Sequence, residues 1–189
     1  MKKKYLFIGI IVLCVIGIAL TTILLLTNTC NKDKEPEEVV TWKENMTEIV
    51  SIKTETIMKD SGVIVYKYVK NLEYESGENA NIVTETSTLN SSFELDTTYS
   101  KEQKVIKKEN TLAINLDRSL YLTFNSSENV IMGTVNNENI NKVLNTSGLE
   151  IKDFATIMIT FNENKLNTIV CNYKTSTNKD VTMTVVYGY

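Results

Sequence analysis

The fold is decided by the closing stretch of the chain, residues 155–189, ATIMITFNENKLNTIVCNYKTSTNKDVTMTVVYGY. Its apolar side chains alternate with polar ones in three runs: Ala155, Ile157, Ile159 and Phe161; Ile169, Cys171 and Tyr173; Val181, Met183, Val185, Tyr187 and Tyr189. Such alternation is typical of strands with one buried face. The connections, 162–165 and 175–180, are short and polar. The sequence therefore predicts a three-stranded antiparallel meander, with Cys171 turned to the core.

Further strands are predicted upstream of this meander. Residues 63–74, VIVYKYVKNLEY, predict a long strand that places on one face Ile64, Tyr66, Tyr68, Leu72 and Tyr74. Residues 81–90 are rich in threonine, which favours an edge strand or a solvent-facing strand. Between residues 112 and 124, two alternating apolar runs flank a polar pair, which predicts either a tight hairpin or one bent strand.

Two short helices are also predicted. In residues 41–51 the apolar side chains recur at helical spacing; they are Trp42, Met46, Ile49 and Val50. In residues 137–146 the i, i+3, i+4 pattern is formed by Ile140, Val143 and Leu144, with Asn136 or Asn137 as cap and Gly148 placed to end the helix. Taken together, these elements predict an α+β domain in which one or two short helices cover a curved antiparallel sheet.

The amino-terminal part of the chain differs from the rest. Residues 5–26 carry no charge, and a helix of that length reaches roughly 33 Å, enough to span a bilayer core. Lys2, Lys3 and Lys4 precede it, so the positive-inside tendency predicts a cytoplasmic amino terminus and a body outside the cytoplasm. We expect a membrane anchor at 1–30 with a helix at about 5–27, a charged tether at 31–40, and an extracytoplasmic domain at 41–189.

Cys30 leaves two alternatives open for this anchor. One is an uncleaved single-pass helix, and the other is a lipoprotein acylated at Cys30, because a cysteine followed by a polar tether resembles the bacterial lipoprotein pattern. Thr27, Asn28 and Thr29 depart from the residues that usually precede such a cysteine, which favours the uncleaved helix. A cleaved secretory signal is disfavoured, because the apolar stretch is long and no A-x-A-like site follows it.

Composition argues against several classes of function. The chain has 20 basic and 23 acidic residues, and three of the basic ones are the amino-terminal lysines. The rest of the chain therefore has 17 basic and 23 acidic residues, a net charge of −6. Nucleic-acid binding needs a basic surface, so that class is excluded. Histidine is absent, the common catalytic and nucleotide-binding motifs are absent, and Cys14, Cys30 and Cys171 form neither a metal-binding pair nor a disulfide framework. We therefore expect a protein that is not an enzyme and that uses no metal or cofactor.

One basic cluster interrupts the polar stretch after residue 90. It comprises Lys101, Lys104, Lys107 and Lys108, and acidic residues separate its members. We interpret the cluster as a solvent-exposed loop or strand face, and Ser100 with Lys101 and Lys104 as part of a solvated loop. The alternative for the cluster is contact with an anionic headgroup or wall polymer.

The layout as a whole carries a resemblance. A tether, a helix and long strands precede the closing segments FNENKLNTIVCNY and VTMTVVYGY, and this order resembles the unclosed β-barrel lipoproteins of the LolA and LppX kind. It is also similar to small membrane-anchored surface proteins and lipoproteins of low-GC bacteria. The resemblance covers about residues 41–189 and includes no signature motif, so it transfers no site residue. It implies a concave sheet able to shelter an acyl chain.

These observations favour a domain that binds an apolar ligand or an envelope component. The predicted groove lies beside the 137–146 helix and is lined by Tyr66, Tyr68, Leu72, Val185 and Tyr187. For the tyrosines, the alternative is a core position with the polar tip at the sheet edge. For the whole domain, the alternative is a structural or protein–protein interaction module at the cell surface.

Overall fold

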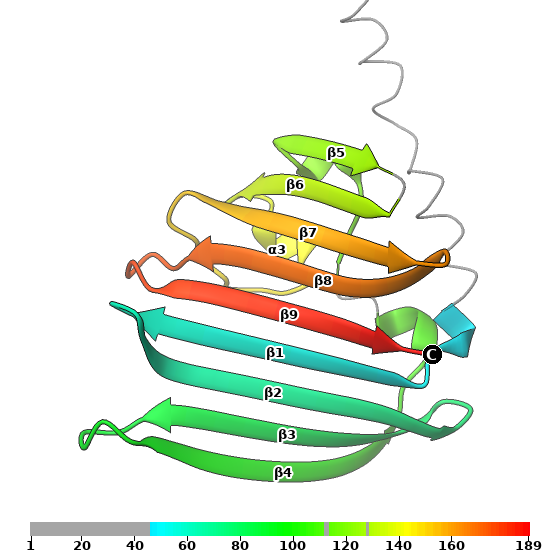
Figure 1. Cartoon of the computed structure of the whole chain (residues 1–189), viewed down its shortest axis with the longest axis horizontal. Coiled ribbons are helices and arrows are strands. Elements are labelled where there is room, and N and C mark those ends of the chain that lie inside the picture. The colour runs from blue at the N-terminus through cyan, green and yellow to red at the C-terminus, as the bar shows by residue number, and fades with distance from the viewer. Residues whose placement is uncertain (1–45, 112–113, 128) are drawn as a thin grey trace, which may run out of the picture. The chain divides into compact units, whose positions relative to one another are not determined.

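The computed structural model describes residues 46–111, 114–127 and 129–189 (Figure 1). These residues all belong to one compact unit of the chain. Among them, no helix has both the length and the apolarity needed to cross a membrane. The expected anchor at 1–30, with Cys30, and the expected tether at 31–40 lie outside the described residues, so these remain predictions.

The described chain forms one antiparallel sheet of nine strands. The strands are β1 (Ser51–Asp60), β2 (Val63–Ser76), β3 (Asn79–Leu89), β4 (Leu95–Val105), β5 (Thr123–Ser127), β6 (Val130–Asn136), β7 (Phe154–Asn162), β8 (Lys165–Lys174) and β9 (Asp180–Gly188). Their order across the sheet is β4-β3-β2-β1-β9-β8-β7-β6-β5, so the first and last strands are central neighbours (Figure 1). The two edges, β4 and β5, do not pair with each other, which leaves the sheet unclosed. The predicted antiparallel sheet is confirmed, and the fold is mostly β rather than α+β.

Strands β7, β8 and β9 confirm the predicted closing meander. Glu163 and Asn164 connect β7 to β8 with φ angles of 50° and 60°. Positive φ at both central residues gives a two-residue turn whose twist matches that of the flanking strands. In the resulting pairing Ile159 lies opposite Ile169, and Cys171 is fully buried at 0 % exposure. The predicted orientation of Cys171 is therefore confirmed.

The core lies on one face of the sheet, which we name the inner face, and Ile159, Ile169 and Val185 are buried there. Two segments cover it: the described residues of the connection from edge strand β4 to edge strand β5, 106–111 and 114–122, and residues 137–151. Buried residues of both segments join the strand residues in one hydrophobic cluster. Because the first segment must run from one edge of the sheet to the other, it supplies the second layer that a sheet needs to bury its apolar face.

The predicted helix at 41–51 is wrong over its described part. Only a single 3-10 turn, η1 (Met46–Glu48), is present, and β1 already begins at Ser51. A backbone hydrogen bond from Ile49 N to Met46 O (3.2 Å) brings these two side chains to the buried side. One turn therefore satisfies the i, i+3 spacing that favoured a helix.

The predicted helix at 137–146 is reduced to one turn, α3 (Ile140–Val143). The Oδ1 of Asn137, a predicted cap, instead accepts a hydrogen bond from the backbone N–H of Ile151 (2.8 Å). Asn145 has a φ of 48°, and this left-handed conformation ends the helical path before the glycine that was expected to end it.

Neither alternative for residues 112–124 is correct over the described part. Residues 114–117 are irregular, η3 (Arg118–Leu120) follows, and β5 starts only at Thr123. The Oδ1 of Asp117 accepts a hydrogen bond from the N–H of Ser119 (2.9 Å), which caps the 3-10 turn. The apolar alternation in this segment places side chains in the covering layer and not in a hairpin.

The polar stretch after residue 90 contains an unpredicted strand, β4, followed by η2 (Lys108–Thr111). The interpretation of Ser100, Lys101 and Lys104 as a solvated loop is wrong, because all three lie in β4, which pairs with β3 along its whole length. The strand-face interpretation is confirmed for the two lysines. Every residue of β4 is exposed, so no apolar alternation marks it in the sequence.

Candidate functional site

The inner face divides into a closed part and an open part. Leu72, Val185 and Tyr187, three residues of the predicted groove, belong to the closed part and are 6 %, 1 % and 4 % exposed. They share a hydrophobic cluster with Ile114 and Ile140 of the two covering segments. In the structure these three side chains are part of the core.

The open part lies toward the carboxyl end of β1. There Tyr68 of β2 lies opposite Thr56 of β1, and Tyr66 lies opposite Met58. These four side chains are only half-buried. In Figure 1, α3 is drawn behind β6 to β8, away from this end of β1 and β2. Tyr66 and Tyr68, the other two residues of the predicted groove, therefore lie together where the described covering segments leave the sheet partly exposed.

A hollow of about 510 Å³, which we name the tip hollow, adjoins Tyr66. It lies at the ends of β1, β2 and β3 beside the connection from β8 to β9, and its lining residues are Met58, Val65, Tyr66, Thr88, Leu89 and Lys179. Of these six residues, Lys179 alone is charged. Small-molecule sites are typically about 300 to 1,000 Å³ and mostly apolar, with a few polar groups that orient the ligand. The tip hollow has that size and that kind of lining.

Val65 reaches the tip hollow because β2 contains a bulge. Met58 pairs with Tyr66 and Lys59 pairs with Ile64, so Val65 has no partner on β1. An extra residue in one strand bends that strand locally and redirects the side chain. The bulge therefore adds an apolar group to the hollow that a regular strand would place on the opposite face.

The connection between β8 and β9 holds Lys179 at the rim. Lys179 N donates to Thr175 Oγ1 (3.1 Å), and Thr175 N donates to Lys179 O (2.9 Å). The neighbouring carboxylate of Asp180 is engaged by Lys174 Nζ at 3.0 Å. Within the part of the chain that the structure describes, the Lys179 ammonium has no ion-pair partner. It is therefore available to an acidic group of a ligand.

One row of inner-face side chains between the core and the tip hollow stays neutral at physiological pH. Burial raises the pKa of the Cys171 thiol to about 12, and burial with a smaller effect from Cys171 raises the pKa of Tyr173 to about 12. Tyr173 pairs with Val181, which in turn pairs with Met58 of the hollow. The row of side chains that leads from the core to the hollow is thus uncharged, so an apolar chain lying along it would not have to bury a charge.

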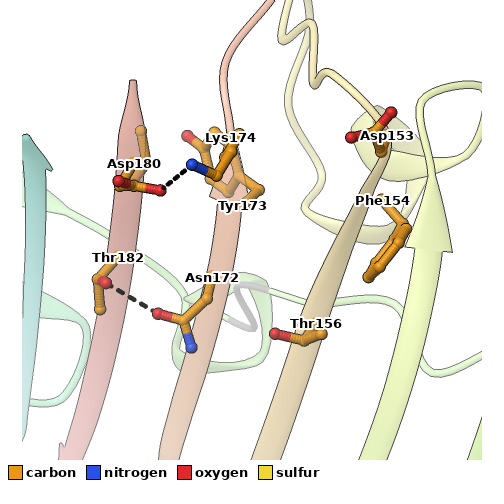
Figure 2. Close-up of a pocket in the computed structure, with 9 residues that line it drawn as sticks. Asp153, Phe154, Thr156, Asn172, Tyr173, Lys174, Asp180 and Thr182 are labelled. Carbon is orange, nitrogen blue, oxygen red and sulfur yellow. Dashed lines mark hydrogen bonds and ion pairs between the residues drawn. The ribbon is translucent and has the colours of Figure 1, made fainter. Parts of the chain in front are cut away.

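A second hollow lies on the opposite, outer face, as Figure 2 shows. It measures about 420 Å³ and is lined by Asp153, Phe154, Thr156, Asn172, Tyr173, Lys174, Asp180, Val181 and Thr182. Thr182 Oγ1 donates to Asn172 Oδ1 (2.8 Å), and Lys174 pairs with Asp180 (3.0 Å). Because these polar groups already bind one another, a polar ligand would have to compete with their mutual contacts.

A third hollow of about 320 Å³ adjoins the second and shares Thr156 and Asn172 with it. Its lining includes Met132 and Met158, which pair with each other, and Phe154 of the second hollow lies on the same face of β7, separated from Met158 by Thr156. These three side chains, which we name the outer strip, are 55 %, 37 % and 55 % exposed in that order. None of the three hollows is lined by a residue of α3, and in the described residues no three Asp, Glu or Cys side chains gather where a metal ion could bind.

Sequence analysis found one residue of the tip hollow, Tyr66, and missed the others. Met58 had a usable signal, because it ends an alternating run that starts at Ile52. Val65 and Lys179 had none. The first depends on a bulge, and the second lies in a connection whose neighbours follow from the order of the strands.

Comparison with known proteins gives a distant structural likeness only. No protein-family model matches the chain, and no curated protein sequence matches it. LprF from Mycobacterium bovis is similar with a TM-score of 0.40 and 10 % identity over 80 % of this chain and 91 % of LprF. A redesigned β-barrel, mFAP1, bound to DFHBI, has a TM-score of 0.25 and 11 % identity over 77 % of this chain and 98 % of the barrel. The chain thus resembles LprF distantly, in an unclosed antiparallel sheet, and at these scores the likeness says nothing about a ligand.

Proposed function

We propose that this domain binds an amphipathic ligand, an acyl chain with an acidic headgroup, in the tip hollow. In this proposal, residues 1–30 hold the domain at the membrane and the domain lies outside the cytoplasm. The observation that carries the proposal is the lining of the hollow, an apolar wall with a single ammonium, that of Lys179, at its rim. The wall suits the chain, and the ammonium suits the headgroup.

The two parts of such a ligand would contribute unequally to affinity. Burial of each CH₂ group contributes about 0.8 kcal/mol. An ion pair between Lys179 and a carboxylate at a half-exposed rim contributes roughly 0 to 1 kcal/mol. Tyr68 and Met183 extend the partly exposed surface from the hollow along the inner face, because both pair with Thr56 of β1. We therefore expect affinity to rise with chain length and headgroup selectivity to depend on Lys179.

The first test measures uptake of a fluorescent fatty acid by the fragment 35–189, which contains all the described residues. Met58→Trp fills the hollow and should reduce the affinity at least tenfold, since the chain loses most of its buried CH₂ groups. The matched control is Met132→Trp, because Met132 is another strand methionine but lies on the outer face and is 55 % exposed. Circular dichroism checks that both variants stay folded. Equal binding by both variants would exclude the tip hollow as the site.

The second test separates the chain from the headgroup. Lys179→Gln should weaken the binding of a fatty acid, and should leave the binding of the fatty alcohol of equal length unchanged, because the alcohol carries no charge. A variant that loses both ligands equally would show that Lys179 supports the turn and does not contact the headgroup. If no acyl chain binds the parent fragment, the proposal is wrong.

The outer strip favours a second candidate function, docking of a protein partner. Met132 and Met158 pair with each other, Phe154 lies on the same face, and exposed apolar side chains grouped on one sheet face are a common feature of interaction sites. Phe154→Ser and Met132→Ser should then abolish binding to a partner without changing fatty-acid uptake. This candidate takes precedence if the parent fragment binds no acyl chain.

A further inference from the structure

The edge strand β4 presents a long, fully exposed edge for strand pairing. All eleven of its residues, Leu95 to Val105, are exposed, and all pair with β3 in a single register without a bulge. Natural proteins usually blunt such edges with short strands, prolines, bulges, covering loops or charged side chains, because a free row of N–H and C=O groups binds other strands. β4 contains no proline and is the longer of the two edges, since β5 has five residues.

We propose that β4 pairs antiparallel with β4 of a second copy of this chain, around a two-fold axis that passes beside Ser100. In this register Ser100 lies opposite its own copy, and the residues before it lie opposite the residues after it. The paired residues are Leu95 with Val105, Asp96 with Lys104, Thr97 with Gln103, Thr98 with Glu102, and Tyr99 with Lys101. The lining of the tip hollow includes no residue of β4, so this proposal does not rest on ligand binding.

The sequence LDTTYSKEQKV is complementary to itself in this arrangement. Leu95 and Val105 are 43 % and 65 % exposed in the single chain, and each would cover the other across the axis. Asp96 would meet Lys104 twice by symmetry, which gives two opposite-charge pairs. One oxygen of Asp96 accepts a hydrogen bond from Asn90 Nδ2 (3.1 Å), which leaves its other oxygen for the lysine. Directly opposed side chains of this kind stabilise antiparallel strand pairs.

Charge also argues against the neighbouring registers. Shifting the axis to Tyr99 places Asp96 opposite Glu102, and shifting it to Lys101 places that lysine opposite its own copy. Like charges directly opposite each other destabilise a strand pair. Both shifts also shorten the overlap, whereas the register centred on Ser100 pairs all eleven residues. Of the three registers compared, the one centred on Ser100 therefore has the most favourable charge pairing and the longest overlap.

The alternative contact, β4 on β5 of another copy, is less favourable. It would pair an eleven-residue strand with a five-residue strand and leave more than half of β4 free. It is also head-to-tail, so it would continue into a ring or an open chain of molecules, whereas pairing of β4 with β4 closes after two copies. In the described part of the chain, the ammonium groups of Lys101 and Lys104 have no ion-pair partner, so both are available across the axis.

The register is tested by cysteine cross-linking of the full chain in lipid vesicles under a mild oxidant. Opposite Cα atoms in an antiparallel pair are about 4.5 to 5.5 Å apart, within the range a disulfide spans. Ser100→Cys should therefore give a covalent dimer on a non-reducing gel. Thr98→Cys is the matched control, because Thr98 lies on the same face of β4 and is also exposed. In the proposed register its Cα would be roughly 13 Å along the strand from the Cα of its own copy. The unaltered chain reports background from Cys14 and Cys30.

Charge reversal tests the same register without a cysteine. Asp96→Lys and Lys104→Asp should each weaken the dimer about tenfold, because each converts two attractive pairs into repulsive ones. The double variant should restore the parent affinity, measured by fluorescence energy transfer between labelled copies. Glu102→Lys, which faces Thr98, should have little effect. Equal cross-linking of Ser100→Cys and Thr98→Cys, or a double variant no tighter than the single ones, would overturn the proposal.

Discussion

β7 and β4 are strands of the same sheet, with nine and eleven residues, yet they differ completely in burial. In β7 every second side chain is buried, whereas in β4 all side chains are exposed. β7 pairs with β6, and β4 with β3, in a register without a bulge, so backbone pairing does not cause the difference. The cause is the covering layer, which lies over the inner face of β7 and not over that of β4. Alternation in a sequence therefore reports that a strand is covered on one face, not that a strand exists.

The largest expected effect comes from removing a side chain under the covering layer. Ile159 of β7 is 0 % exposed. Ile159→Ala should cost about 2 to 5 kcal/mol of unfolding free energy, because it leaves a cavity in the core. Thr98→Ala in β4 should change stability by less than about 0.5 kcal/mol, because that position is solvated. Urea unfolding of both variants measures these changes. Similar losses of unfolding free energy in the two variants would contradict the difference in burial between β7 and β4.

The next effect concerns the contact between the covering layer and β6. A Cβ atom at Gly133 would lie 2.6 Å from Tyr121 Cδ1 and 3.0 Å from Thr123 O. The Tyr121 ring also packs edge-on against Phe124, with ring centroids 5.1 Å apart, so it has little room to move. Gly133→Ala should therefore destabilise the domain by about 1 to 3 kcal/mol through overpacking. Tyr121→Ala in the same chain should relieve most of that added cost, and strict additivity in thermal unfolding would contradict the predicted contact.

Burial of Cys171 predicts a loss of stability in alkali. The pKa of its thiol is raised from 9.0 to about 12, so below pH 9 the thiol is protonated in both the folded and the unfolded chain. As the pH rises from 9 toward 12, the unfolded chain loses this proton and the folded chain keeps it, which favours unfolding. The slope for one such group is about 1.4 kcal/mol per pH unit. Cys171→Ala should make the curve of stability against pH flatter in this range, and parallel curves would contradict the burial.

The same residue gives a kinetic check at constant pH. A thiol reagent should label Cys171 slowly in the folded chain and rapidly in denaturant, because the side chain is fully buried at 0 % exposure. Equal rates in the two conditions would count against the pairing of β7, β8 and β9.

The smallest expected effect lies on the outer face of β1 and β2. Lys67 Nζ and Glu55 Oε1 are 3.0 Å apart on β2 and β1, with side chains 33 % and 31 % exposed. A double-mutant cycle with Lys67→Gln and Glu55→Gln should give a coupling of about 0.2 to 1 kcal/mol that falls with added salt. A coupling as large as the Ile159→Ala effect would mean that this part of the sheet is far better shielded from water than its exposure indicates.

The covering layer also explains which predictions from the sequence were confirmed. β7, β8 and β9 were predictable because their inner faces are covered, so Ile157, Ile159 and Ile169 alternate with polar residues. β4 was not predictable from alternation, because no side of it is covered. The helices were overestimated for another reason. Met46 with Ile49, and Ile140 with Val143, have helical spacing but need only one turn each to reach the core.

The candidate site was predictable only in part, because a local sequence pattern marks some of its residues and the path of the covering segments decides the others. Tyr66 and Tyr68 stand out in sequence because aromatic residues at a spacing of two favour a strand face. Leu72, Val185 and Tyr187 share that face, and only the path of the covering segments decides that they are core and the tyrosines are not. That path depends on contacts between residues far apart in the chain, which no local pattern records.

The central position of β1 beside β9 determines when the sheet can complete its folding. Ser51 pairs with Gly188, so the middle of the sheet cannot form until nearly the whole described chain is present. The hairpins on either side of this seam are local and can form early, whereas the seam must wait for a long-range encounter, which slows folding. Until the seam forms, β1 and β9 are free edges, and each presents a row of unpaired N–H and C=O groups along its length. We therefore expect folding to be completed only after β9 has been synthesised, with aggregation most pronounced in chains halted before it.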